Sequence, residues 1–166
     1  MKHLLLLFAG LIFVLAGCSK TKDPDPLTQS QVIARLWKMQ QYDLIIDDKV
    51  GPTLYTRGSN SNLDDYSMSQ FNFKTDGSFA QSDVDDKGKP VQETGTWKLT
   101  NADKTLELTF ANKTVAALNV VALSATELTV NQKTALKDLD AATLAALKTV
   151  EIQPKINFGF QFMFRP

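Results

Sequence analysis

Residues 155–165 read KINFGFQFMFR, the most regular alternation of apolar and polar side chains in the chain. One parity holds Ile156, Phe158, Phe160, Phe162 and Phe164, and the other holds Asn157, Gly159, Gln161, Met163 and Arg165. A period of two residues is that of a β-strand with one buried face. A strand this apolar cannot be a loose tail. We therefore expect it to face the interior and to close a sheet by pairing with the first strand.

The first strand is predicted at residues 36–46, LWKMQQYDLII. Its alternation slips near Gln40-Gln41, because Trp37 and Met39 share one parity whereas Tyr42, Leu44 and Ile46 share the other. A β-bulge at the slip would return both sets to one face. A short helix at residues 28–34, with Thr28 or Ser30 as its N-cap, is predicted before this strand.

Short alternating runs separated by polar turns fill most of the middle of the chain. Strands are predicted at residues 68–74, 78–82, 91–100, 106–110, 114–123 and 127–131. Asp76-Gly77 is the strongest hairpin signal among the turns. The absence of a helical period between these runs is typical of an antiparallel meander in a sandwich or barrel. Residues 47–65 are expected to be mostly loop, with a brief strand at 53–56.

One helix is predicted near the C-terminus, at residues 134–150, TALKDLDAATLAALKTV. Leu136, Leu139, Thr143, Leu147 and Val150 recur there at steps of three and four residues. This spacing would place them on one face of a helix. We expect that helix to lie against the outside of the barrel or across one of its mouths.

The first 17 residues have the layout of a cleaved export signal. A basic start precedes a run of thirteen almost wholly apolar residues, 4–16, which is shorter than the roughly 20 residues of a spanning helix. The run ends Leu15-Ala16-Gly17-Cys18, which resembles the bacterial lipobox. The resemblance implies cleavage before Cys18 and a lipid on its thiol. Residues 18–27, with two Asp-Pro steps, would follow as an extended tether.

A lipid on Cys18 implies a membrane as partner and the cell envelope as location, with the outer membrane expected on either its periplasmic or its surface side. Cleavage takes 17 of the 166 residues and leaves 149, with 17 basic and 18 acidic side chains once Lys2 is gone. With basic and acidic side chains so evenly balanced, the protein has no positive electrostatic field that would attract nucleic acid. The oligomeric state stays open.

Processing would also remove much of the reactive chemistry, because the only histidine is His3 and the only cysteine is Cys18. A Ser-His-Asp triad, a cysteine nucleophile, a zinc site of His or Cys, and haem ligation through His are then excluded. Asp47-Asp48, Asp64-Asp65 and residues 83–88 fit exposed turns better than catalytic carboxylates or a calcium loop. We expect no enzyme activity, no cofactor and no metal.

A series of motifs in order resembles the lipocalin-like domains of bacterial lipoproteins. They are Ile33-Ala34-Arg35-Leu36-Trp37-Lys38, FNFKTDGSF at 71–79, TGTWKL at 94–99, LEL at 106–108 and ELTV at 127–130. Arg35 stands where the family has glycine, and the predicted helix and final strand vary the family's ending. The resemblance covers about residues 33–131, and we expect one lipocalin-like domain over residues 28–166. Its fold would be an antiparallel up-and-down barrel of about eight strands with a central cavity, a short N-terminal helix and one helix near the C-terminus.

Because a fold does not determine a function, two hypotheses from different classes stay open. The first is binding of a small, mostly apolar ligand in the barrel cavity. Its candidate lining residues are Trp37, Tyr42, Phe71, Phe73, Trp97, Phe158, Phe160 and Phe162. The second is a non-catalytic module with a filled core that binds a protein or glycan through loop 47–65. A barrel of eight strands is just wide enough for either a filled interior or one small ligand.

Overall fold

The computed structural model describes residues 26–62, 65–85, 87–149 and 151–166. The predicted signal at 1–17, Cys18 and the tether up to residue 25 lie outside the described residues, as do Asp64 and Val150. No helix within these ranges is long and apolar enough to cross a membrane.

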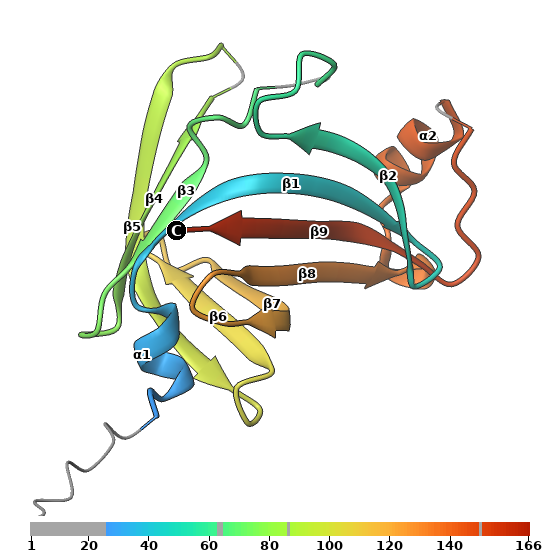
Figure 1. Ribbon diagram of the computed structural model, residues 1–166. Coiled ribbons are helices and arrows are strands. Elements are labelled where there is room, and N and C mark those ends of the chain that lie inside the picture. Colours follow the sequence, from blue (N-terminus) through green and yellow to red (C-terminus); the bar gives the residue numbers. More distant parts are fainter. Residues whose placement is uncertain (1–25, 63–64, 86, 150) are drawn as a thin grey trace, which may run out of the picture.

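Nine strands and three short helical elements make up the described part of the chain (Figure 1). The strands are β1 Leu36–Ile46, β2 Lys49–Thr56, β3 Gln70–Phe73, β4 Ser78–Val84, β5 Pro90–Thr100, β6 Thr105–Phe110, β7 Val115–Leu123, β8 Leu128–Ala135 and β9 Asn157–Arg165. The helical elements are α1 Gln29–Ile33, the 3-10 turn η1 Leu136–Asp138 and α2 Ala141–Thr149. Thr28 caps α1, as one of the two predicted N-caps.

The sheet closes into a barrel because β9 returns to β1. The strand order is β2-β1-β3-β4-β5-β6-β7-β8-β9, and β1 pairs with β9 from Lys38↔Arg165 to Ile46↔Phe158. Leaving out β2, which joins β1 beside the ring, eight antiparallel strands form the closed barrel. The predicted lipocalin-like barrel and its closing strand are therefore confirmed. The strand begins only at Asn157, however, so Ile156, predicted to face the interior, precedes it and is 60% exposed.

A β-bulge in β1 places the two sets of apolar side chains on one face, as predicted. The register between β1 and β9 shifts between Met39 and Gln41. Before the shift, Trp37 and Met39 are buried in the core. After it, Tyr42 lies opposite Phe162. The inner face of the barrel thus continues along the whole of β1.

The inner face of the closed barrel is filled with aromatic and aliphatic side chains. Its buried members are Trp37, Met39, Phe73, Phe79, Trp97, Leu106, Leu108, Leu118, Leu128, Val130 and Phe164, and Ile33 of α1 and Tyr55 of β2 are buried in the same cluster. The indole N–H of Trp37 donates to the Ile33 carbonyl at 2.8 Å, and that of Trp97 donates to the Lys74 carbonyl at 3.0 Å. Because both indole donors have a partner, the rings are buried without an unsatisfied polar atom.

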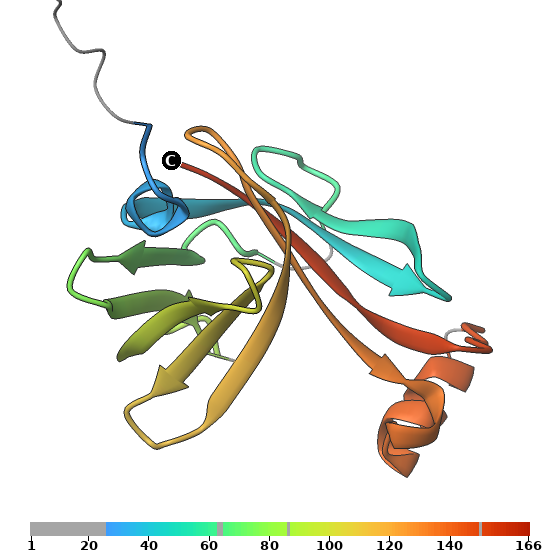
Figure 2. The same cartoon turned by 90° about the horizontal axis from the view of Figure 1, so that it is seen from below.

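Four strands continue beyond the closed barrel. β8 pairs with β7 only as far as Asn131 but stays paired with β9 to Ala135. β1 pairs with β3 over residues 36–38 and with β2 from Gln41 onward. The outer parts of β2, β1, β9 and β8 therefore splay away from β4–β7 (Figure 2). We call these outer parts, with η1 and α2, the flared end; α1 and the C-terminus lie at the opposite end (Figure 1).

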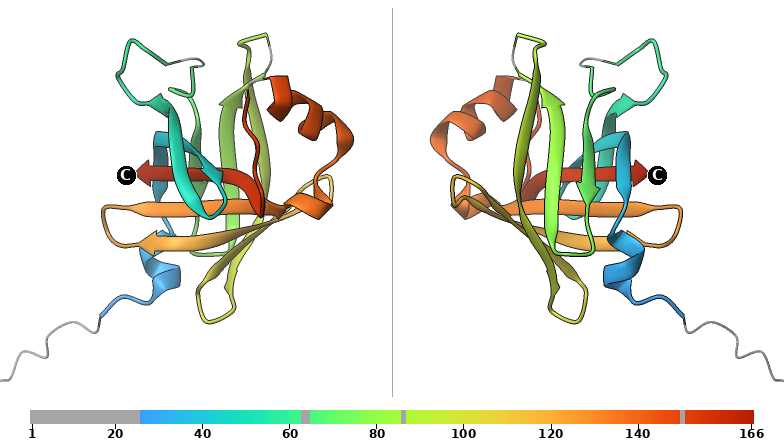
Figure 3. Two further views of the ribbon diagram at one scale, coloured as in Figure 1. Left: turned by 90° about the vertical axis from the view of Figure 1, so that its right-hand side faces the viewer. Right: turned by 90° about the vertical axis from the view of Figure 1, so that its left-hand side faces the viewer.

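The helix near the C-terminus is shorter than predicted. Thr134 and Ala135 belong to β8, because they pair with Phe158 and Asn157 of β9, and α2 begins only at Ala141. Pairing with β9 thus overrides the helical spacing at the start of the predicted segment. Leu147 is buried on α2 and packs with Leu44 and Phe158. The helix consequently lies at the mouth of the flared end, on the opposite side from β2 (Figure 3).

Residues 49–56 form a full strand, where a brief strand at 53–56 was predicted. Asp47 and Asp48 make the tight turn before it, with φ of 53° and 63°. Aspartate tolerates this left-handed region better than most residues. Within the described residues β2 pairs with β1 alone, and an edge position accommodates Pro52, which has no N–H to donate.

Candidate ligand pockets

The predicted cavity residues nearest the core are packed inside the closed barrel. Trp37, Phe73 and Trp97 are buried there, and Phe71 stacks on Phe73 with ring centroids 5.4 Å apart. The Phe73 and Trp97 rings meet edge to face at 5.6 Å. These rings therefore pack against one another in the core.

The other predicted cavity residues lead outward from this core. Tyr42 stacks on Phe162 with centroids 4.9 Å apart and lies 5.4 Å from Phe160. Phe160 in turn meets Phe158 edge to face at 5.3 Å. Tyr42, Phe160 and Phe162 are half-buried. The predicted residues therefore form one continuous aromatic face that runs from the filled core to the flared end.

A pocket of about 410 Å³ opens on this face at the flared end, and we call it the flared-end pocket. Phe158, Gly159 and Phe160 line it from β9, and Gln132 and Thr134 line it from β8. Asp138, Leu139 and Asp140, which connect β8 to α2, line the remaining side. Gln132 lies opposite Phe160 and Thr134 opposite Phe158, so these four side chains share the inner face.

Gly159 allows β8 and β9 to approach each other beside the pocket. A Cβ atom at this position would stand 2.2 Å from the carbonyl oxygen of Gln132 and 2.8 Å from the Cα of Lys133. Both are backbone atoms, so any larger residue would push β8 away from β9. The shape of the pocket wall thus depends on this glycine.

The Asp47-Asp48 turn fastens the start of β9 to the flared end. The Asp47 carboxylate accepts hydrogen bonds from the backbone N–H groups of Lys155 and Ile156, each at 2.7 Å. These bonds lower the pKa of Asp47. Asp48 accepts from the Lys133 ammonium at 2.7 Å and from the Asn157 amide at 3.0 Å, and these two contacts lower its pKa. The turn therefore joins β1, β8 and β9 at the edge of the flared end.

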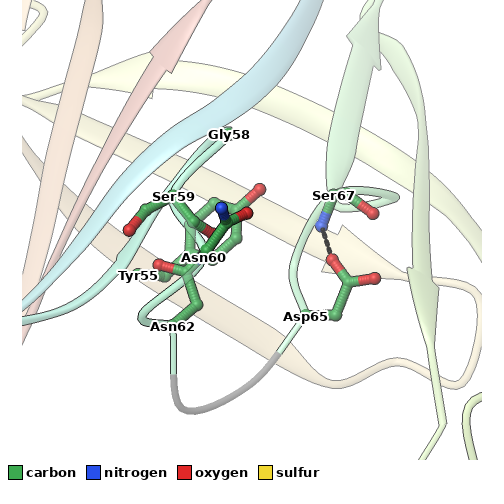
Figure 4. Close-up of a pocket in the computed structure, with 7 residues that line it drawn as sticks. All are labelled: Tyr55, Gly58, Ser59, Asn60, Asn62, Asp65 and Ser67. Carbon is green, nitrogen blue, oxygen red and sulfur yellow. Dashed lines mark hydrogen bonds between the residues drawn. The ribbon is translucent and has the colours of Figure 1, made fainter.

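A second pocket, of about 510 Å³, lies between the end of β2 and the following loop, and we call it the loop pocket (Figure 4). Its lining residues are Tyr55, Gly58, Ser59, Asn60, Asn62, Asp65 and Ser67. The Asn62 side chain accepts from the Thr56 N–H at 2.9 Å and donates to the carbonyls of Thr56 and Ser59. These bonds order one wall of the loop pocket.

Charged and polar groups surround the loop pocket. Asp65 accepts hydrogen bonds from the hydroxyl of Ser67 and from its backbone N–H, the second of which is dashed in Figure 4. These bonds, together with the nearby Arg57 guanidinium, lower the pKa of Asp65. Burial raises the pKa of Tyr55. Arg57 donates through Nε to the Met39 carbonyl at 2.6 Å, while its Nη2 is buried without a partner among the described residues.

The sequence profile of the lipocalin-like domain matches residues 33–130, more than half of the chain. This chain belongs to the lipocalin-like domain family. The matched segment runs from the end of α1 into β8, so it contains most of the barrel and the loop pocket, whereas the flared-end pocket lies beyond it. No curated protein matches the chain.

Two solved structures are similar to this lipocalin-like domain at low identity. One is a lipocalin-like protein from Bacteroides uniformis ATCC 8492, with 15% identity, coverage of 81% of this chain and 97% of that chain, and a TM-score of 0.47. The other is an uncharacterized protein from Bacteroides eggerthii DSM 20697, with 13% identity, coverage of 80% and 97%, and a TM-score of 0.46.

Sequence reasoning found the aromatic floor of the flared-end pocket but missed its other side. Gln132, Thr134, Asp138, Leu139 and Asp140 were not among the predicted lining residues of this lipocalin-like domain. Gln132 lies just past the strand predicted at residues 127–131. The helical spacing of residues 134–150 concealed the others, since Thr134 belongs to β8, and Asp138 and Asp140 belong to the connection between β8 and α2. Within the described residues, no group of three or more His, Cys, Asp or Glu side chains is placed to hold a metal ion.

Proposed function

We propose that the protein binds a small, mostly apolar molecule in the flared-end pocket, at the open mouth of its barrel. The observation that carries this proposal is a pocket of about 410 Å³ with Phe158 and Phe160 in its lining. Small-molecule sites typically measure about 300–1,000 Å³ and combine apolar walls with a few polar groups. Here Gln132 and Thr134 supply polar groups that would orient the ligand.

Because side chains fill the closed barrel, a ligand would bind at its mouth. Trp37 and Phe73 are 0% and 2% exposed and contact other core side chains, so their atoms already have neighbours. Phe160 and Phe162, in contrast, are half-buried. Removing the rest of these rings from water would favour binding of an apolar molecule on them.

The binding test uses the chain expressed from Ser19 onward and the uncharged fluorescent probe N-phenyl-1-naphthylamine. We expect micromolar binding that is at least about tenfold weaker in Gln132→Trp, because the exposed Gln132 lines the pocket and an indole there would fill it. Val115→Trp, at an exposed position on β7, is the matched control and should bind the probe normally. Equal binding by the two variants would contradict the proposed site.

The proposal extends to a lipid on Cys18 that holds the domain at the cell envelope, with the outer membrane as the expected membrane. Because α1 and α2 lie at opposite ends of the barrel (Figure 1), a tether that enters through α1 leaves the flared-end pocket on the side away from the attachment point. Cells grown with labelled palmitate should label the full chain. The Cys18→Ala variant should lose both the label and membrane pelleting; a labelled, membrane-bound variant would contradict the anchor.

A second candidate function is binding of a protein or glycan through the loop pocket. Its supporting observation is a polar lining that Asn62 holds in order, beside an Arg57 guanidinium whose Nη2 has no partner among the described residues. Buried donors of this kind usually pair with water or a ligand. Retention on a glycan array that is lost in Asn60→Ala and kept in Gln132→Trp would favour this candidate. No retention by the unmodified chain would remove a glycan as its ligand.

A further inference from the structure

We infer that the protein has a second ligand site, beside α2, for a single-chain molecule with an anionic head, such as an alkyl carboxylate. The site is a pocket of about 380 Å³, which we call the α2 pocket. This volume lies within the roughly 300–1,000 Å³ of small-molecule sites. None of its lining residues lines the flared-end pocket, so the two sites are separate and the inference does not rest on the proposed function.

Five apolar side chains form most of the α2 pocket. They are Leu136 of η1, Leu144 and Leu147 of α2, and Ile152 and Pro154 of the segment that follows α2. Leu147 is buried, whereas the other four are half-buried. An alkyl chain lying on these four side chains would remove more of their surface from water, which favours binding.

Backbone hydrogen bonds hold the walls of the α2 pocket in place. The Ile152 N–H donates to the Leu147 carbonyl at 2.9 Å, where the chain leaves α2. The Leu136 N–H donates to the Ile156 carbonyl at 2.9 Å, next to the last pair between β8 and β9. These bonds form the pocket before a ligand arrives, which lowers the entropic cost of binding.

Lys148 gives the α2 pocket a positive charge. Among the described lining residues it is the one with an ionisable side chain. That side chain is exposed and makes no ion pair with another described residue. Glu151 is the nearest acidic residue in the sequence, but it neither lines the pocket nor pairs with Lys148. A ligand with a negative head therefore meets an opposite charge at this site.

The last turn of α2 leaves the Lys148 ammonium available to a ligand. A basic side chain at this end of a helix often donates to the last carbonyl groups. Here the Leu147 carbonyl accepts from the Ile152 N–H, and the Lys148 carbonyl accepts from the Glu151 N–H at 3.1 Å. Because the backbone supplies these donors, the ammonium is not needed as a cap. A carboxylate could pair with it while the alkyl chain lies on the leucines.

Three probes with one chain length and different charges test the inference: decanoate, decanol and decyltrimethylammonium. They are titrated below their micelle concentrations into the isotope-labelled chain expressed from Ser19 onward, and amide NMR signals report both affinity and location. The chain carries Gln132→Trp, which fills the flared-end pocket. We expect decanoate to shift the amide signals of residues 144–153 and to bind roughly fivefold tighter than the ammonium compound, with decanol between them.

Two further variants locate the site. Gln153→Trp should weaken decanoate binding at least about tenfold, because Gln153 is exposed and an indole there would fill the α2 pocket. Lys148→Gln should weaken decanoate binding roughly twofold to fivefold and leave decanol unchanged, since exposed ion pairs are modest. Lys104→Gln, at an exposed lysine between β5 and β6, is the matched control and should alter neither.

The results that would overturn the inference are distinct from those that bear on the flared-end pocket. Decanoate that shifts signals elsewhere, or binds Gln153→Trp as tightly as before, would contradict the α2 pocket as the site. An ammonium compound that binds as tightly as decanoate, or a Lys148→Gln variant with unchanged decanoate affinity, would contradict the anionic head. Because Gln132→Trp fills the flared-end pocket in every titration, none of these outcomes tests the proposed function.

Discussion

The closed barrel and the flared end share β1, β8 and β9, yet their inner faces differ in how completely they are buried. Among the described residues, thirteen buried side chains form the cluster centred on the barrel, Ile33 of α1 and Tyr55 of β2 included, whereas three form the cluster at the flared end. In the barrel, strands on every side cover the inner face. At the flared end, Leu147 of α2 packs on the same face, against Leu44 and Phe158. The same alternation thus gives a buried core where the sheet closes and a half-buried surface where it opens.

The largest expected effect compares the same substitution in the two regions. Leu108→Ala in the barrel and Leu147→Ala on α2 remove side chains that are 1% and 6% exposed. We expect Leu108→Ala to cost about 4 kcal/mol of unfolding free energy and Leu147→Ala about 2 kcal/mol, because the smaller cluster can collapse around the lost atoms. Urea denaturation measures both. An equal or larger loss for Leu147→Ala would mean that the flared end is packed like the core.

Two glycines give a second comparison. A Cβ at Gly95 would stand 2.2 Å from the Thr109 carbonyl oxygen, and one at Gly159 would stand 2.2 Å from that of Gln132. Each alanine substitution should cost about 1–3 kcal/mol, and Gly95→Ala should cost more because the closed ring cannot yield. Gly159→Ala should also weaken binding of N-phenyl-1-naphthylamine by moving the pocket wall. Thermal melts and probe titrations check this; weaker binding in Gly95→Ala alone would contradict it.

The smallest effect is a pH dependence confined to the flared end. Hydrogen bonds lower the pKa of Asp47, so its carboxylate stabilises the folded state above the unfolded pKa of about 3.9, and this contribution is lost as the pH falls through the folded value. Amide exchange should therefore show protection at Lys155 and Ile156 falling below about pH 4. The Asp47→Asn variant should lack that step.

The closed barrel supplies a control for this pH effect. The hydroxyl and backbone N–H of Ser78 lower the pKa of Asp76 in the β3–β4 hairpin. Protonation of Asp76 should leave the amides of the neighbouring strands protected, because Phe79 is buried in the barrel core. Constant protection at Lys155 and Ile156 from pH 6 to pH 3 would show that the Asp47 turn does not hold the flared end together.

Much of the fold followed from short-range patterns. The alternation in residues 36–46 predicted both β1 and its bulge, because a bulge is the local way to keep apolar side chains on one face. Asp76-Gly77 predicted the turn between β3 and β4, and Gly77 adopts φ of 82°, which a glycine reaches without strain. The errors came where a distant partner decided the outcome, as at Thr134, which pairs with Phe158.

By itself, then, the sequence determined most of the strands, their inner faces and the closing role of residues 155–165, because periodicity and turn chemistry are properties of neighbouring residues. Only the tertiary structure decided where the aromatic face is filled and where it is open. That outcome depends on where β8 leaves β7 and on contacts between distant segments, such as Asp47 with Ile156. Phe73 and Phe160 look alike in the sequence; one is enclosed by the barrel and the other lines a pocket, because the sheet closes around only one of them.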